Sequence, residues 1–168
     1  MPLISTRGAA SAQGFGEFAQ SAAVNYIEDV FSTYLYTGNG STQTITNGID
    51  LSGKGGLVWM KGRSGATDHA LYDTARGATK DLVSNSTAAE TTQATGLTAF
   101  SGTGFSIGAL AKLNTSSATY ASWTFRKQAK FFDVVTWTGD GSFPRVISHA
   151  LGAVPGCIIV KKTSAADN

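Results

Sequence analysis

The sequence is short of the residue types that build reactive and metal sites. It has one cysteine, Cys157, and two histidines, His69 and His149. A single cysteine excludes an internal disulfide framework and a multi-cysteine metal site. Neither histidine stands in a metal-ligand spacing such as His-Glu-x-x-His. No nucleophile–base motif and no pair of catalytic carboxylates is recognisable. The sequence therefore predicts no enzyme, no cofactor and no metal site, and we expect Cys157 to be a small buried hydrophobe.

Charged side chains are also scarce. They make up 14% of the residues and leave a net charge of +2, so the basic footprint of a nucleic-acid-binding protein is missing. No apolar run approaches the length of a membrane-spanning helix. Residues 1–8 lack the charged and then apolar pattern of a signal peptide. We therefore expect no nucleic-acid partner, no membrane insertion, and a protein that is made in a cytoplasm and stays there or leaves by lysis.

Apolar, β-branched and aromatic residues are well represented and occur in short stretches. The chain has 168 residues, 42% of them hydrophobic, which is enough for one sizeable core. Turn-forming residues separate the stretches, and no helical pattern competes beyond a short helix within residues 18–31. This spacing predicts an all-β antiparallel sandwich or jelly roll. The predicted strands are 31–36, 43–46, 57–61, 69–73, 80–83, 97–100, 104–107 and 120–125.

Two turns are predicted from local signals. Asn39-Gly40 favours a β-hairpin of type I′, because both central residues of that turn need a positive φ. A second hairpin is predicted around Gly102. Residues 84–95 and 108–118 are rich in small polar residues and predict exposed loops.

Large aromatic residues are the predicted core. We expect Trp59, Trp123, Phe125 and Phe105 to pack inward, because large aromatics dominate core burial. An alternative stays open, in which Trp59, Trp123 and Trp137 build a platform on which a sugar stacks.

The chain uses one sequence pattern twice. Each copy begins with an aromatic residue, then Thr-Gly, then Asn or Asp, and then Gly-Ser. A linker follows, and the copy ends with Gly, four apolar residues and Lys. The pattern occupies residues 36–61 and recurs at 137–161, with a spacing that differs by one residue. Such self-similarity indicates one supersecondary unit used twice. We therefore expect a β-sandwich module at 31–126 and the start of a second, incomplete module at 127–168, opened by a strand at 131–137.

The N-terminal tract consists mainly of small residues. Residues 5–24 cannot bury enough apolar surface alone to offset their ordering entropy. They are either a disordered tail or part of an extended arm, residues 1–30, that becomes ordered against a partner. In the second interpretation Arg7, Phe15, Phe18 and Tyr26 anchor the arm.

Several stretches resemble a known family. Residues 1–18, 25–40, 73–78, 84–85 and 120–125 resemble the concanavalin-A-like (laminin-G-like) β-sandwich modules in virion proteins of tailed bacteriophages, especially phages of marine cyanobacteria. The similar module runs from a Thr-Gly-Asn-Gly turn to a Tyr-x-Ala/Ser-Trp strand, which maps to about residues 31–126. The family has no catalytic set to carry over. Its Lys-Lys-x-Ser segment is followed by a further strand, so we expect a chain that is truncated or partly ordered.

The resemblance implies a role in a virion. It favours a structural protein, the N-terminal part of a tail fibre or similar appendage, that docks onto the particle through its N-terminal arm. The implied partners are other virion proteins, such as a tail adaptor, a nozzle or neighbouring subunits, within a homotrimer. The alternative is a carbohydrate-binding, lectin-like module for a glycan on the host surface. A hydrolase would need facing carboxylates, and the sequence offers none to name.

Overall fold

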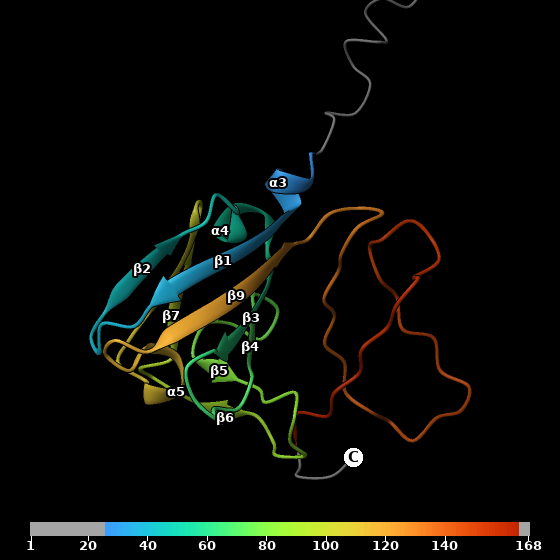
Figure 1. The fold of residues 1–168 in the computed structure, drawn as a ribbon. Coiled ribbons are helices and arrows are strands. Elements are labelled where there is room, and N and C mark those ends of the chain that lie inside the picture. Colours follow the sequence, from blue (N-terminus) through green and yellow to red (C-terminus); the bar gives the residue numbers. More distant parts are fainter. Residues whose placement is uncertain (1–25, 165–168) are drawn as a thin grey trace, which may run out of the picture.

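The computed structural model describes residues 26–164 of the chain. Strands dominate residues 27–126, which we call the β body, with one short helix before the first strand and two between strands (Figure 1). The elements are α3 (Ile27–Val30), β1 (Phe31–Thr37), β2 (Gln43–Thr46), α4 (Leu51–Lys54), β3 (Gly56–Gly62), β4 (Ala70–Asp73), β5 (Lys80–Asp81), β6 (Thr91–Thr92), β7 (Leu97–Ser101), β8 (Gly104–Ile107), α5 (Ala111–Asn114) and β9 (Thr119–Arg126).

The strands form antiparallel sheets. The largest has the order β1-β9-β3-β4, a second has the order β2-β8-β7, and β5 pairs with β6. Every strand predicted between residues 31 and 126 overlaps an observed strand, and β6 lies in a stretch that we expected to be loop. The prediction of an all-β antiparallel fold is confirmed.

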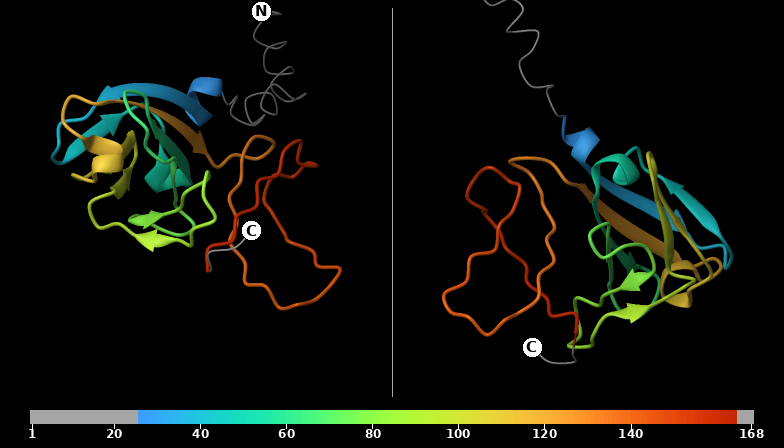
Figure 2. Two further views of the ribbon diagram at one scale, coloured as in Figure 1. Left: turned by 60° about the horizontal axis from the view of Figure 1, so that its bottom comes forward. Right: turned by 180° about the vertical axis from the view of Figure 1, so that it is seen from behind.

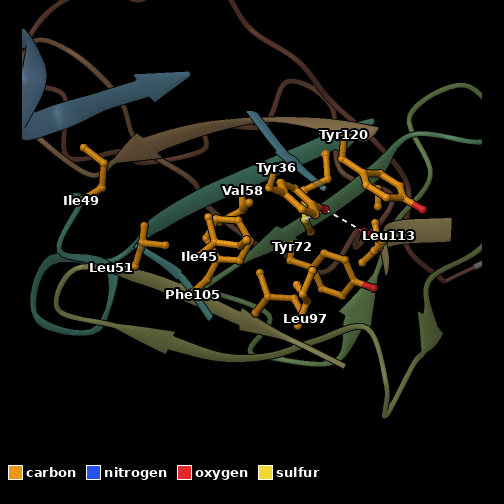
Figure 3. Close-up of a cluster of buried hydrophobic side chains, with 13 residues drawn as sticks. Tyr36, Ile45, Ile49, Leu51, Val58, Tyr72, Leu97, Phe105, Leu113 and Tyr120 are labelled. Atoms are coloured by element: carbon orange, nitrogen blue, oxygen red, sulfur yellow. Dashed lines mark hydrogen bonds between the residues drawn. The ribbon is translucent and has the colours of Figure 1, made fainter. Parts of the chain in front are cut away.

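The two larger sheets contribute to one hydrophobic core. The first supplies Tyr36 and Tyr120, whose rings stack with centroids 5.1 Å apart. The second supplies Phe105, which is fully buried as expected, with Ile45 and Leu97 beside it (Figure 3). The hydroxyl of Tyr36 donates a hydrogen bond of 2.9 Å to a backbone carbonyl of α5. That bond keeps a polar group satisfied inside the core.

Three of the aromatics that were expected in the core lie elsewhere. Trp59, Trp123 and Phe125 are half-buried and are not members of the core cluster. Successive side chains of a strand point to opposite faces. Val58 is buried in the core, so its neighbour Trp59 must point away from it. The expectation of inward packing is therefore corrected for these three residues, which lie on what we call the outer face of the four-stranded sheet.

The expected hairpin at Asn39-Gly40 is also wrong. β1 pairs with β9, whereas β2 pairs with β8 in the other sheet, so the turn carries the chain from one sheet to the other. Gly40 has a φ of 70°, but Asn39 is not among the described residues with a positive φ. Buried Asn114, which is distant in the sequence, stabilises the turn. Its Oδ1 accepts a 2.8 Å hydrogen bond from the backbone N–H of Asn39. The hairpin predicted around Gly102 is confirmed as the β7–β8 pair.

Residues 127–164 follow the β body as a long irregular excursion. They contain no helix and no strand, only an isolated bridge between Gln128 and Phe132 (Figures 1 and 2). The strand expected at 131–137 is therefore not formed. The excursion returns to the β body at its far end, where the Lys161 ammonium donates a 2.7 Å hydrogen bond to the carbonyl of Ser86. Cys157 is exposed rather than buried.

A buried ion-pair network fixes the turn after β4. Asp73 accepts hydrogen bonds from the backbone N–H groups of residues 75 and 76, and its other oxygen lies 2.5 Å from Nε of Arg76. The guanidinium of Arg76 also reaches Glu90, at 3.1 Å, and the carbonyls of Leu71 and Lys80. Arg76 therefore ties the turn at 74–79 to β4, β5 and the loop before β6.

Replacing Arg76 by alanine should destabilise the β body strongly. The change leaves the carboxylate of Asp73 buried without its partner, which costs about 3–5 kcal/mol in comparable cases. Equilibrium unfolding in urea measures the loss. The control is Lys54→Ala at an exposed position of α4, for which we expect a change within about 0.5 kcal/mol. Equal stabilities of the two variants would show that the network contributes nothing.

Candidate functional site

The described residues contain no obvious reactive centre. Within residues 26–164, no group of three or more His, Cys, Asp or Glu side chains is placed to hold a metal ion. Two small cavities, of about 220 and 70 Å³, are lined by residues between 127 and 156. Both are below the size of ordinary ligand pockets. In the same part of the chain, no helix is long and apolar enough to cross a membrane. The candidate sites are therefore surfaces.

The outer face of the four-stranded sheet is the first such surface. Its register places Trp59 of β3 opposite Trp123 of β9, with ring centroids 6.2 Å apart. Phe125 follows on the same face and meets Phe31 of β1 at 4.9 Å. Leu35, farther along β1, is exposed. An antiparallel sheet whose second face meets water normally carries polar residues there, so this row of apolar side chains is suited to contact with another surface.

Part of the outer face is covered by the chain itself. Phe132, just after the β body, stacks on Phe125 with centroids 5.3 Å apart. Next to it, Asp133 pairs with Lys127 at 2.9 Å and accepts a hydrogen bond from the backbone N–H of Ala150. These hydrogen bonds and the nearby charge of Lys127 lower the pKa of Asp133 against the opposing effect of burial. The start of the excursion is thus attached at the β9 end of the sheet.

A polar rim borders the two tryptophans. Nε1–H of Trp59 donates a 2.7 Å hydrogen bond to Nδ1 of His69. The side chain of Asn85 accepts a hydrogen bond from the backbone N–H of His69 and donates one to Asp68, each 2.9 Å long. The rim therefore joins the loop before β4 to the loop after β5, and it links a carboxylate and an amide to Trp59 through His69.

His69 is neutral in this arrangement, because its Nδ1 acts as an acceptor. Burial lowers its pKa, the nearby ammonium of Lys61 lowers it further, and the carboxylate of Asp68 opposes both. Because the folded-state pKa of His69 lies below the unfolded value of 6.5, the unfolded chain binds a proton at pH values at which His69 of the folded protein is still neutral. The contribution of neutral His69 to the free energy of unfolding is therefore fully present above pH 6.5 and is lost as the pH falls through the lower, folded-state pKa.

The stability of the protein should therefore fall in weakly acidic solution in a way that depends on His69. We expect His69→Gln, whose amide oxygen can still accept the Trp59 hydrogen bond, to remove that part of the pH dependence. Urea unfolding followed by tryptophan fluorescence at a series of pH values measures it. The control is His149→Gln, which changes the other histidine. Identical pH profiles for His69→Gln and the unaltered chain would contradict the assignment.

The second surface lies where the N-terminal region joins the β body. Of the four predicted docking residues, Arg7, Phe15 and Phe18 lie outside the described residues. Tyr26 is described, and it is 60% exposed, as is Ile27 beside it. Neither Ile27 nor the outer face is among the sites predicted from the sequence. The signal for the outer face was present in β3, where apolar residues occupy successive positions 57–60 instead of alternating with polar ones.

The comparison with protein families gives one match. Residues 27–168 match the model of a domain of unknown function, DUF7483. The chain belongs to this family. The DUF7483 match includes both the β body and the excursion that follows it. Comparisons with curated proteins and with solved structures gave no match.

Proposed function

We propose that this DUF7483 protein is a structural component of a tailed-phage virion, the N-terminal part of a tail fibre or similar appendage. In this proposal the β body is a concanavalin-A-like jelly roll that serves as a rigid spacer, and residues 1–30 dock onto another virion protein. The protein is not an enzyme, and it binds neither nucleic acid nor a membrane. Its copies assemble as a homotrimer. The resemblance of the sequence to phage virion modules supports this role.

One structural observation carries the docking part of the proposal. Tyr26 and Ile27 are each 60% exposed, although α3 is anchored to the β body by buried Val30. Two adjacent exposed apolar side chains at the start of an anchored helix are suited to a contact with another protein. They follow the small-residue tract that carries Phe15 and Phe18, so the proposed anchors belong to one stretch of the chain.

The polar clusters of the β body support a structural role. The carboxylates of Asp73 and Glu90 share Arg76, and Asp81 pairs with Lys112. The first cluster joins β4 to the loop before β6, and the second joins β5 to α5. These acidic groups therefore hold the fold in shape instead of facing one another across a cleft, as a glycosidase would need.

Deletion of residues 1–24 should leave the β body folded but abolish its incorporation into particles. A sharper variant is Phe15→Ala with Phe18→Ala, because loss of two aromatic anchors should weaken docking by orders of magnitude at a hot spot. The matched control is Gln13→Ala with Gln20→Ala in the same tract. Copy number in purified virions is the measurement. Normal incorporation of the deletion variant would refute the docking role.

A second candidate function is recognition of a carbohydrate. The observation in its favour is the rim in which His69 links Asn85 and Asp68 to Trp59. An aromatic surface with amides and carboxylates nearby suits a sugar, whose ring has apolar faces and hydroxyl groups. Trp59 and Trp123 lie on the sheet, whereas Trp137 lies in the excursion. The aromatic surface of this candidate therefore consists of Trp59 and Trp123 without Trp137.

This candidate predicts glycan binding that depends on the outer face. Trp123→Ala should abolish binding on a glycan array, because the aromatic surface beside Trp59 is lost. Trp137→Ala, which removes the tryptophan outside the sheet, is the control and should bind normally. Absence of any bound glycan, or equal loss in both variants, would reject carbohydrate recognition at this face.

A further inference from the structure

An ion pair between β5 and α5 lies in the interior of the β body. Nζ of Lys112 donates a hydrogen bond to Oδ2 of Asp81, and the two side chains are 19% and 3% exposed. The second oxygen of Asp81 is buried, and among the described residues it has no hydrogen bond of ordinary geometry. A carboxylate that leaves water without full hydrogen bonding is costly to keep ionised. The burial of this pair therefore favours an uncharged form of the two groups.

The pair of Lys127 and Asp133 is arranged differently. Asp133 accepts hydrogen bonds from the backbone N–H groups of Val134 and Ala150 in addition to its contact with Lys127. The side chain of Lys127 is 36% exposed, so its ammonium also keeps contact with water. This pair is stabilised as two ions, and it provides a comparison within the same chain.

The hydroxyl of Tyr72 on β4 lies near the carboxylate of Asp81. Tyr72 is fully buried (Figure 3), and its hydroxyl forms no hydrogen bond of ordinary geometry within residues 26–164. Burial raises the pKa of Tyr72, and the nearby charge of Asp81 raises it further. The hydroxyl therefore keeps its proton and can pass it to an oxygen of Asp81.

We propose that Lys112 and Asp81 condense to an intramolecular amide, which makes this pair a covalent cross-link between α5 and β5. The fold holds the amine and the carboxyl group in contact, so the reaction needs little further ordering of the reactants. The amide carries no charge, so its formation removes the cost of keeping two ions buried.

The reaction balances within the three side chains. The ammonium of Lys112 first passes a proton to the carboxylate of Asp81, which leaves a neutral amine and a neutral acid. Nζ then attacks Cγ, so a C–N bond forms, and one C–O bond of the carboxyl group breaks. Tyr72 donates a proton to the departing oxygen and takes one back from the nitrogen, as a general acid and base. One ammonium and one carboxylate thus give one amide and one water molecule, and no other reactant is required.

The cross-link closes a ring of chain from residue 81 to residue 112, and this ring contains β6, β7 and β8. Covalent closure of a loop restricts the unfolded chain and so stabilises the folded one. The inference goes beyond the proposed function and does not depend on it, because the bond is a property of the isolated chain.

Mass spectrometry of the intact, denatured chain tests the proposal. We expect a mass that is lower than that of the sequence by one water molecule. Lys112→Arg keeps a positive charge beside Asp81 but cannot form the amide, because a guanidinium stays protonated. This variant should therefore have its full mass. The matched control is Lys127→Arg in the other pair, which should still lack one water.

A trypsin digest locates the bond, because trypsin does not cleave after an acylated lysine. A chain without the cross-link is cut after Lys112 and gives the separate peptides 81–112 and 113–126. The cross-linked chain should give one peptide, 81–126, that lacks one water. A full mass for the unaltered chain, cleavage after Lys112, or a loss of water that persists in Lys112→Arg would overturn the proposal.

The role of Tyr72 is tested by the rate at which the bond forms. The mass of the chain is followed over time after cell-free synthesis. Tyr72→Phe should lose water at least about tenfold more slowly than the unaltered chain, because the proton relay is removed. Equal rates for the two chains would overturn the role of Tyr72 as the general acid and base.

Discussion

Strand β9 holds the four-stranded sheet together. It pairs along its length with β1 on one side and with β3 on the other, so it joins these two strands within the sheet. The contact is close at the start of β3, where a Cβ on Gly56 would lie 2.1 Å from the carbonyl oxygen of Phe125. Only glycine fits there without moving the strands apart. The core and the outer face both follow from this pairing, because it sets the register of the sheet.

The sheet is apolar on both faces, and this distinguishes it from a sheet that simply closes a core. One face carries Tyr36 and Tyr120 into the buried cluster. The other carries Trp59, Trp123 and Phe125, which are only partly covered. Burying such a face gains roughly 25 cal/mol for each Å² of apolar surface removed from water. This gain favours docking, whether the occupant is the excursion, a ligand or another subunit.

Loops in the β body are held by side chains that lie far away in the sequence. Asn114 of α5 holds the turn at Asn39 through hydrogen bonds in both directions. Arg76 connects its own turn to Glu90. These bonds satisfy buried polar groups that would otherwise cost about 1–3 kcal/mol each. They give the β body a fixed shape, in contrast to the excursion, which joins it mainly at Phe132 and near Ser86.

The sequence by itself determined where the strands lie and that the fold is all-β, because aromatic and β-branched stretches between turn residues are local signals. It also determined that one pattern occurs twice. The tertiary structure alone decided which strands pair, which face of each strand is buried, and that Asn39 lies in a link between sheets. The alternation of side chains along a strand predicts that Val58 and Trp59 point to opposite sides of the sheet, but it does not predict which side faces the core. That choice depends on distant partners such as β8 and β9. The same reason explains the excursion, whose strand-like sequence forms no strand where no partner strand lies beside it.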